Sequence, residues 1–332
     1  MSHLKRFMPA EWHQQDGILI AWPHLGTDWA DMIDEVTSCY IGLARAIARH
    51  ERLLIVAPDP EEVRSALGED CCGNITFYAL PTNDTWTRDY GPITVIDDGQ
   101  PVLLDFTFNA WGMKFAADCD NMVTRRMGQA GAFKAVVDSH LDMVLEGGSI
   151  ESDGRGTIMT TRQCLLSSNR NDAWSENRIA QELCDRLGAA QVLWLDHEPL
   201  AGDDTDAHID TMARFAPGNV VLVVDEALSR QVARFTDASG VPYRPVVMPA
   251  PPLIDDELGM PLPATYLNFL ITNRQVLVPT YGCETTDRQA IQMLADYFPG
   301  REVHGIDCRA LIKQHGSLHC ATMQFPANTL NK

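Results

Sequence analysis

The chain has 332 residues, of which 45% are hydrophobic and 21% are charged, and its formal net charge is −19 at pH 7. The composition is typical of a globular protein, and the length suffices for one large core or for two domains. An acidic surface repels phosphate backbones and anionic lipid headgroups, so nucleic acid and membrane are excluded as first candidates for a partner, whereas a cationic small molecule would be attracted. Solubility alone also accounts for such a surface.

The sequence carries no targeting signal that we recognise. Its N-terminal segment lacks the apolar run of a signal peptide, and no window reaches the ~18 uninterrupted apolar residues of a membrane span. Nine cysteines are scattered along the chain without a Cys-x-x-Cys pair, and the adjacent Cys71 and Cys72 are interpreted as ordinary thiols. We therefore expect a cytoplasmic protein.

Short apolar runs rich in β-branched or aromatic residues recur along the chain, and each is predicted to form a strand. They are Ile18–Trp22, Leu53–Ala57, Ile75–Leu80, Ile93–Ile96, Val102–Phe106, Thr157–Thr161, Val192–Leu195, Val220–Val224, Leu267–Thr272 and Val276–Pro279. Apolar residues at three- and four-residue spacing predict helices between some of them. The clearest helices are Trp29–Arg49, Ala173–Leu187 and Thr286–Tyr297.

The order of these elements predicts an α/β protein with mixed strand pairing. Several strands follow one another before a helix arrives, and Asn273-Arg274-Gln275 is typical of a tight hairpin between the last two strands. Hairpins combined with crossover helices favour a mixed sheet over a doubly wound parallel sheet. No Gly-x-Gly-x-x-Gly or Gly-x-x-x-x-Gly-Lys-Ser/Thr motif is present, so dinucleotide and nucleoside-triphosphate binding lose their usual support.

Four polar segments lie beside turn residues at the ends of predicted strands, where sites are often built. The first, Asn83–Pro92, contains Asp89 and fits a surface loop with an incidental ion pair equally well. In the second, Glu146 precedes Gly147-Gly148, whose glycines would allow positive φ or close approach of another segment. Taken alone, this second segment is better explained as a plain β-turn.

The third segment, Asp203–Asp210, combines a histidine with several acids. Strand alternation across His208-Ile209-Asp210 would place His208 and Asp210 on one face. A metal site needs three or four ligands, and the partners expected at four-residue spacing are missing. A histidine whose pKa is tuned by carboxylates fits this pattern better, although a lone solvated histidine stays open.

The fourth segment, Gln314–Cys320, places Cys320 after a Gly-Ser turn and a histidine. A buried inert thiol is the commonest fate of a cysteine, but this polar context could present a thiolate. A cysteine, a histidine and three carboxylates suggest nucleophilic catalysis. A neutral peptide carbonyl needs no group of acids, whereas a guanidinium matches carboxylates bidentately and is buried only with paired charges.

In this order, the segments resemble the guanidine-modifying enzymes of the pentein fold, most closely the branch with agmatine deiminases and bacterial peptidylarginine deiminases. The likeness covers nearly the whole chain, so one catalytic domain over residues 1–332 is expected. The motifs that carry it are Met8-Pro9-Ala10-Glu11-Trp12, Ala21-Trp22-Pro23, Trp86-Thr87-Arg88-Asp89, Asn109-Ala110-Trp111-Gly112, Leu145–Ser149, Cys164–Asn171, His208-Ile209-Asp210, Tyr266–Phe269 and His319-Cys320.

The resemblance implies a pentein α/β-propeller of five pseudo-symmetric ββαβ units around a central site. It also implies that Cys320 attacks the guanidinium carbon, that Asp89 and Asp210 grip the guanidinium nitrogens, and that Glu146 orients His208. His208 would protonate the departing ammonia and then activate the water that releases a ureido product from a thiouronium intermediate. The implied enzyme is a hydrolase of linear amidines that uses no metal and no organic cofactor.

Agmatine is the substrate that the sequence favours. Only acids, Asp204 among them, surround His208, and the base nearest to Trp111 is Lys114. Such a loop would attract the distal ammonium of agmatine, whereas arginine needs a cationic clamp for its carboxylate. Trp86 and Trp111 would pack along the four-carbon tail. The product would be N-carbamoylputrescine plus ammonia, as in polyamine biosynthesis through putrescine.

Alternatives remain at this point. Peptidyl-arginine also lacks a free carboxylate, other guanidino compounds are processed in the same fold, and a homo-oligomer stays open. A non-catalytic pentein binding protein would lack the cysteine or the histidine, and a papain-like protease would carry its Cys before its His. Ala207, Gln314-His315 and Glu151 depart from the pattern of the relatives, and we expect these departures to reshape the pocket rim.

Overall fold

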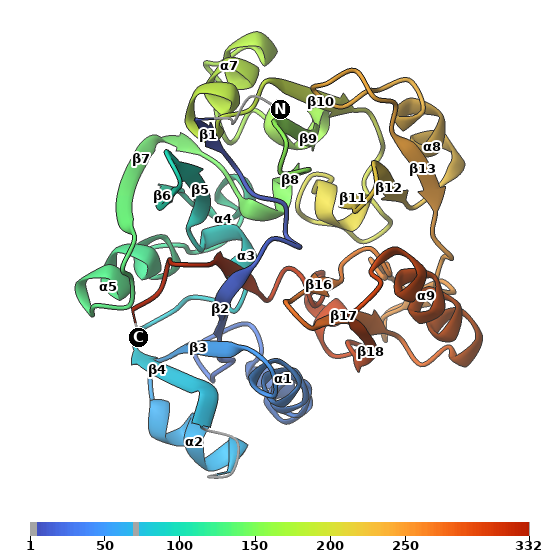
Figure 1. The fold of residues 1–332 in the computed structure, drawn as a ribbon. Coiled ribbons are helices and arrows are strands. Elements are labelled where there is room, and N and C mark those ends of the chain that lie inside the picture. The colour runs from blue at the N-terminus through green and yellow to red at the C-terminus, as the bar shows by residue number, and fades with distance from the viewer. Residues whose placement is uncertain (1–4, 69–72, 332) are drawn as a thin grey trace.

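Residues 5–68 and 73–331 are described by a computed structural model, in which five small sheets surround a common centre (Figure 1). Longer helices lie on the outside of this ring, among them α2, α7, α8 and α9 (Figure 1). Cys71 and Cys72, which we expect to be ordinary thiols, lie outside the described residues. No helix in this part of the chain is long and apolar enough to cross a membrane.

The sheets are best followed strand by strand, in their hydrogen-bonded order. They are β19 (Met323–Pro326), β2 (Gln15–Ala21), β3 (Arg52–Ala57) and β4 (Ile75–Ala79); β1 (Arg6–Phe7), β5 (Ile93–Asp97), β6 (Gln100–Thr107) and β7 (Val136–Val144); β10 (Gln191–Leu195), β9 (Thr157–Thr161) and β8 (Ile150–Ser152); β11 (Ala213–Ala216), β12 (Val220–Val223) and β13 (Arg244–Val247); and β16 (Leu270–Ile271), β17 (Gln275–Thr280) and β18 (Glu302–Asp307). A separate hairpin joins β14 (Ile254–Asp255) to β15 (Pro261–Leu262).

The helices lie between these strands, and short ones accompany the loops. The α-helices are α1 (Ile33–Ala48), α2 (Pro60–Leu67), α3 (Thr87–Tyr90), α4 (Ala110–Met113), α5 (Val123–Gln129), α6 (Arg162–Leu165), α7 (Glu176–Leu187), α8 (Glu226–Val232) and α9 (Glu284–Tyr297). Five 3-10 turns are η1 (Ala30–Met32), η3 (Asp120–Met122), η4 (Gly147–Ser149), η5 (Ile209–Thr211) and η6 (Leu311–Gln314) among the described residues.

One pairing pattern recurs in all five main sheets of the described chain. An antiparallel pair is followed by a helix and then by a strand that pairs in parallel, as in β11, β12, α8 and β13. The first of these sheets takes its antiparallel partner from far along the sequence, because β19 pairs with β2. Parallel and antiparallel pairs therefore share each sheet, which confirms the predicted mixed pairing.

The predicted helices form, and local chemistry fixes where they begin and end. The predicted helix Ala173–Leu187 begins only at Glu176, because Ser175 caps it by accepting from the backbone N–H of Arg178. It ends at Gly188, whose φ of 70° suits glycine. On α1, the buried residues fall at helical spacing and face the sheet, so the amphipathic pattern was a sound guide.

The predicted strand Leu267–Thr272 was too long, since only Leu270–Ile271 pairs as a strand. Side chains take the hydrogen bonds that a neighbouring strand would have used. Arg214 donates to the carbonyl groups of Leu267 and Phe269, and Glu11 accepts from the backbone N–H of Ile271. This irregular stretch carries residue 268 to the candidate site.

Candidate active site

One pocket brings together much of the predicted site. Five predicted residues line it: Trp86, Asp89, Trp111, Asp204 and Cys320. The other residues in its wall are Asp28, Asp84, Phe115, Thr205, Gln314, His315 and Gly316. The remaining predicted residues, Glu146, His208 and Asp210, are fully buried beside this wall. Residues that are far apart in the sequence are thus gathered at one place.

Cys320 lies on the loop before β19 and is 5% exposed. Asn268 Nδ2 donates to its Sγ at 3.2 Å, and Asn268 Oδ1 accepts from the backbone N–H groups of His319 at 2.9 Å and Cys320 at 3.2 Å. One buried amide therefore fixes both the thiol and its backbone. Burial, together with the charges of Asp210 and Asp89, raises the pKa of the Cys320 thiol well above its usual value, so the free protein holds it protonated.

His208 and Asp210 reach the site from a 3-10 turn, so the expected strand alternation was wrong. His208 is the last residue before η5 and Asp210 lies within it, which still turns both side chains to the site. Residues Asp206 and Ala207 precede them with φ of 65° and 69°. A left-handed backbone of this kind favours glycine, so Ala207 holds a strained conformation next to His208.

Three buried polar atoms at this place have no hydrogen-bond partner. They are both ring nitrogens of His208 and Oδ1 of Asp210. His208 Nδ1 is 3.7 Å from Asp89 Oδ1, and Asp210 Oδ2 is 3.8 Å from Cys320 Sγ. Unpaired buried polar atoms are rare because they are costly. A ligand N–H group would satisfy Asp210 Oδ1, which can only accept while its carboxylate is ionised.

Asp89 lies in α3 and is held through both carboxylate oxygens. Trp111 Nε1 donates to Oδ2 at 2.9 Å, and the backbone N–H of Gly148 donates to Oδ1 at 2.9 Å. Trp111 can reach Asp89 because residues 110–113 all have positive φ, between 51° and 91°. The Asn109 side chain closes this strained turn by accepting from the backbone N–H of Gly112.

Gly147 and Gly148 are required for close approach. A Cβ at Gly148 would lie 2.7 Å from His208 Nδ1, 2.8 Å from Asp89 Oδ1 and 3.1 Å from Asp210 Oδ2. A Cβ at Gly147 would lie 2.2 Å from the Arg88 carbonyl oxygen. Of the two uses that the sequence suggested for these glycines, the structure shows close approach rather than positive φ.

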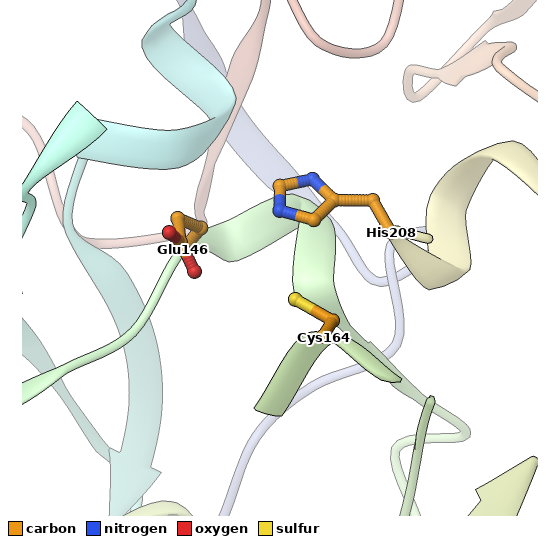
Figure 2. Close-up of side chains that lie close together, drawn as sticks. All are labelled: Glu146, Cys164 and His208. Carbon is orange, nitrogen blue, oxygen red and sulfur yellow. The ribbon is translucent and has the colours of Figure 1, made fainter. Parts of the chain in front are cut away.

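Glu146, Cys164 and His208 face one another in a buried group (Figure 2). One ligand atom from each lies within 4.8 Å of the others. Burial opposes a charge on His208, but Asp89, Cys164 and Glu146 outweigh it and raise its pKa well above the usual value. The geometry therefore supplies a protonated histidine next to the pocket.

Arg170 connects the loop of Glu146 to the loop of His208. Its Nε lies 2.9 and 3.0 Å from the two carboxylate oxygens of Glu146, and its Nη1 donates to Asp206 Oδ2 at 2.6 Å. Asp206 also accepts from Lys114 Nζ at 3.0 Å. Both cations are thus already paired, and neither lines the pocket.

The titration of Asp89 predicts an acid limit on binding of a cation. Burial, against the lowering effect of His208, raises the pKa of Asp89 to about 6. As pH falls through this value the carboxylate gains a proton and loses its charge. The catalytic efficiency kcat/KM for a guanidinium substrate should therefore fall about tenfold per pH unit below pH ~6.

The matched variant for this experiment is Asp84→Asn. Asp84 lies in the same pocket, and burial raises its pKa to about 6 as well. If Asp89 causes the fall of kcat/KM at acid pH, this fall persists in Asp84→Asn and disappears from the residual activity of Asp89→Asn. A fall that begins near the ordinary carboxylate pKa of ~4 in the unsubstituted protein would contradict the assignment.

Comparison with known proteins identifies the family. The model of the Porphyromonas-type peptidyl-arginine deiminases matches residues 7–326. The chain belongs to this family. A Legionella pneumophila protein provisionally named agmatine deiminase is 35% identical over 338 residues, covering 96% of this chain and 95% of that protein.

Solved structures of relatives of this deiminase family share the fold. A protein of Porphyromonas gingivalis, provisionally assigned as an arginine deiminase, superposes with a TM-score of 0.93 at 45% identity, covering 98% of this chain and 100% of that one. An agmatine deiminase of C. jejuni with substrate bound superposes with a TM-score of 0.89 at 31% identity, covering 96% of each chain. The chain thus has the predicted pentein fold.

Among the described residues of this deiminase-family chain, two groups contain residue types that ligate metals. They are Glu146, Cys164 and His208, and Glu11, Glu151 and His319. In both, a buried arginine already pairs with the carboxylates: Arg170 with Glu146, and Arg214 with Glu11 and Glu151. A guanidinium so placed supplies the positive charge that these acids need.

Sequence reasoning missed the roles of several residues, although Glu11, Asn268 and His319 stand in family motifs. Glu151 was expected to reshape the pocket rim, and this was wrong, because it is buried against Arg214 and absent from the pocket wall. The signal that could have found this pair is the charge of Arg214 inside the apolar strand β11. A charged residue within a buried strand requires a partner.

Proposed function

We propose that this chain is a hydrolase that deiminates agmatine to N-carbamoylputrescine and ammonia through a covalent intermediate on Cys320. One observation carries the proposal: four carboxylates line the pocket, at Asp28, Asp84, Asp89 and Asp204, and no lysine or arginine does so among the described residues. A substrate with two positive charges fits such a pocket, and a carboxylate at its tail would be repelled.

The guanidinium end of agmatine would lie between Asp89 and Asp210. Asp210 offers its unpaired Oδ1, and each oxygen of Asp89 keeps a lone pair beside its single donor. Cys320 Sγ lies 3.8 Å from Asp210 Oδ2 and shares the pocket wall with Asp89, which is the position that an attack on the guanidinium carbon requires. Charge pairing on two sides makes burial of the cation tolerable.

The bound cation also activates the thiol. Asp89 and Asp210 raise the pKa of Cys320 in the free protein, and a guanidinium between them would cancel their charge and lower that pKa again. The thiol loses its proton to solvent as the substrate binds, and the thiolate then forms a bond to the guanidinium carbon. Protonated His208 gives its proton to the departing nitrogen, which leaves as ammonia and generates a thiouronium.

The second half of the reaction consumes one water. His208, now neutral, takes a proton from this water as its oxygen attacks the thiouronium carbon, and the carbon–sulfur bond breaks to restore Cys320. One water is added and one ammonia lost, so the product is the ureido compound. We propose that Glu146 orients His208 during both proton transfers, since it faces the imidazole (Figure 2).

The aminobutyl tail would run along aromatic walls towards the acidic rim. Trp86 and Trp111 line the pocket, and Gly316 lets Trp86 approach closely, because a Cβ there would lie 2.3 Å from the Trp86 ring. Asp204 lies at the same wall for the distal ammonium. Arg88 turns away to Gln324 and to the carbonyl oxygen of His319, so it offers no clamp for a carboxylate.

A second candidate is deimination of an arginine within a peptide. The family description and the absence of a cationic clamp in the described pocket favour this alternative too, because a peptidyl arginine has no free carboxylate. A non-catalytic binding role is disfavoured by the presence of Cys320 and His208. Other guanidino compounds without a tail carboxylate remain a third class.

The proposed substrate predicts the ratio of the kcat/KM values for agmatine and free arginine. We expect kcat/KM for agmatine to exceed that for free arginine by at least about tenfold at low salt, because like charges repel in a partly buried pocket. A ureido assay on agmatine, arginine and peptidyl-arginine measures it. A ratio below one would contradict agmatine while leaving deiminase chemistry in place, and a higher efficiency with peptidyl-arginine would select the second candidate.

The arrangement of the sheets as a propeller and the cellular location of the enzyme are also part of the proposal. The recurring antiparallel pair, helix and parallel strand support five pseudo-symmetric ββαβ units that form a propeller, in one domain over residues 1–332. We propose that the enzyme acts in the cytoplasm without metal or organic cofactor, on a small cationic substrate and with no nucleic acid or membrane partner.

A further inference from the structure

His319, the neighbour of Cys320, is held between two carboxylates. Its Nδ1 lies 2.8 Å from Asp210 Oδ2, and its Nε2 lies 2.7 Å from Glu11 Oε2. The side chain is 2% exposed, and its backbone N–H donates to Asn268 Oδ1. Both ring nitrogens therefore have one short polar contact each, and in both the partner is an acid.

Buried cations other than His319 favour ionisation of both acids: Arg214 pairs with Glu11, and the charges of His208 and Arg214 act on Asp210. Burial alone would raise the pKa of Glu11, but Arg214 and His319 outweigh it and hold this pKa far below its usual value. Burial likewise opposes ionisation of Asp210, and the hydrogen bond from His319 again outweighs it and lowers the pKa. An ionised carboxylate only accepts hydrogen bonds. Each ring nitrogen must therefore carry a proton.

The buried charges around the imidazole are of both signs. Glu11, Glu151 and Asp210 are acids, Arg88 and Arg214 offset them, and the charge of His208 also acts on Asp210. A proton on each ring nitrogen of His319 places positive charge directly between Glu11 and Asp210, and unpaired buried charge is what proteins avoid most strongly.

We propose that His319 is an imidazolium that positions Asp210 for the substrate, occupying one carboxylate oxygen and leaving the other for the guanidinium. It is a positioning residue, since its ring lies behind Asp210, and Asp210 makes the proposed substrate contact. Oδ2 of Asp210 is taken by His319, whereas Oδ1 is buried and unpaired. The positioning role rests on the proposed function, but the protonation state does not.

Nitrogen NMR on the intact protein tests the protonation state. Histidine ring nitrogens labelled with 15N report whether each carries a proton, and the His319 signals are assigned by their response to Cys320→Ser. We expect a proton on both His319 nitrogens at pH ~7.5, because each nitrogen lies within hydrogen-bond distance of an acid. The exposed His304, which contacts one acid through one ring nitrogen, is the internal reference for the signals. A bare His319 nitrogen at this pH would overturn the proposal.

Kinetics test the positioning role. His319→Gln removes the charge and keeps one amide donor, so Asp210 becomes easier to protonate. We expect kcat/KM for agmatine to fall on the order of 10²-fold near pH 7, with the acid limb of its pH profile moved to higher pH and activity partly regained there. His304→Gln, a surface ion pair, should leave the profile unchanged.

A double-mutant cycle separates this role from a merely structural one. In the Asp210→Asn background, His319→Gln should cost less than about threefold, because the residue through which it acts has lost its charge. The positioning role would be overturned if the losses of the two single variants multiply in the double variant and the pH at which kcat/KM falls on the acid side does not move. If the unsubstituted protein turns over no guanidino compound, the proposed function fails instead, and the NMR result still decides the protonation state.

Discussion

Cys320→Ala is expected to fold normally and to lose at least ~10³-fold in turnover of agmatine. The reason is that no covalent intermediate forms without the sulfur, and a nucleophile of this kind supplies several kcal/mol of transition-state stabilisation. Cys320→Ser should be nearly as inactive, because a serine hydroxyl beside Asp89 and Asp210 is far harder to deprotonate than a thiol. Steady-state ureido assays with each purified variant measure the loss.

The control is Cys184→Ala, which removes a half-buried thiol on α7 that lines neither the pocket nor the group around His208. It should keep full activity. A haloacetamidine, which presents an amidinium to the acids of the pocket, should label Cys320 before the other eight cysteines. Full turnover by a folded Cys320→Ala protein would remove the covalent mechanism altogether.

Asp210→Asn should cost more than Asp89→Asn, and both should lower kcat/KM by a factor that corresponds to ~2–5 kcal/mol. Each change removes one of the two charges that a buried guanidinium needs. Asp210→Asn also removes an anionic partner of His319, whereas Asn at position 89 can still accept from Trp111 or from Gly148. Measurements over a range of agmatine concentrations separate kcat from KM.

Two observations check that these losses are local. Iodoacetamide, a neutral reagent, should still alkylate Cys320 in both variants, because the pocket remains open. Asp225→Asn, which changes the N-cap of α8, should retain wild-type efficiency, since asparagine caps a helix as well as aspartate. Wild-type efficiency in Asp89→Asn or Asp210→Asn would exclude that residue from the site.

Periodic patterns predicted the regular parts of the fold well. The strands Thr157–Thr161 and Leu53–Ala57 appear almost as predicted, and Thr286–Tyr297 lies within α9. In these segments the burial of apolar residues, which the sequence records, decides the conformation. The five residues expected for catalysis also lie together, although the roles given to them rested on family resemblance and remain to be measured.

The remainder depends on contacts that no local pattern records. Trp111 reaches Asp89 only through a turn of four residues with positive φ, and nothing in its composition except Gly112 signals that turn. Likewise, the pattern Leu267–Thr272 predicts a strand, but Glu11 and Arg214 take its hydrogen bonds. Arg214 is 53 and 55 positions from the two residues it contacts, and Glu11 is 260 positions from Ile271, so local propensity fails there.

The pairing of β19 with β2 has a consequence for synthesis of the protein. Cys320 and β19 emerge from the ribosome roughly three hundred residues after β2, whose outer edge has no strand to pair with until then. In the later part of this interval the nascent chain contains Asp89, His208 and Asp210 but still lacks the nucleophile, so it cannot carry out the reaction. The same interval leaves an apolar strand edge open to other chains, which makes this edge the place where we expect chaperones to be needed.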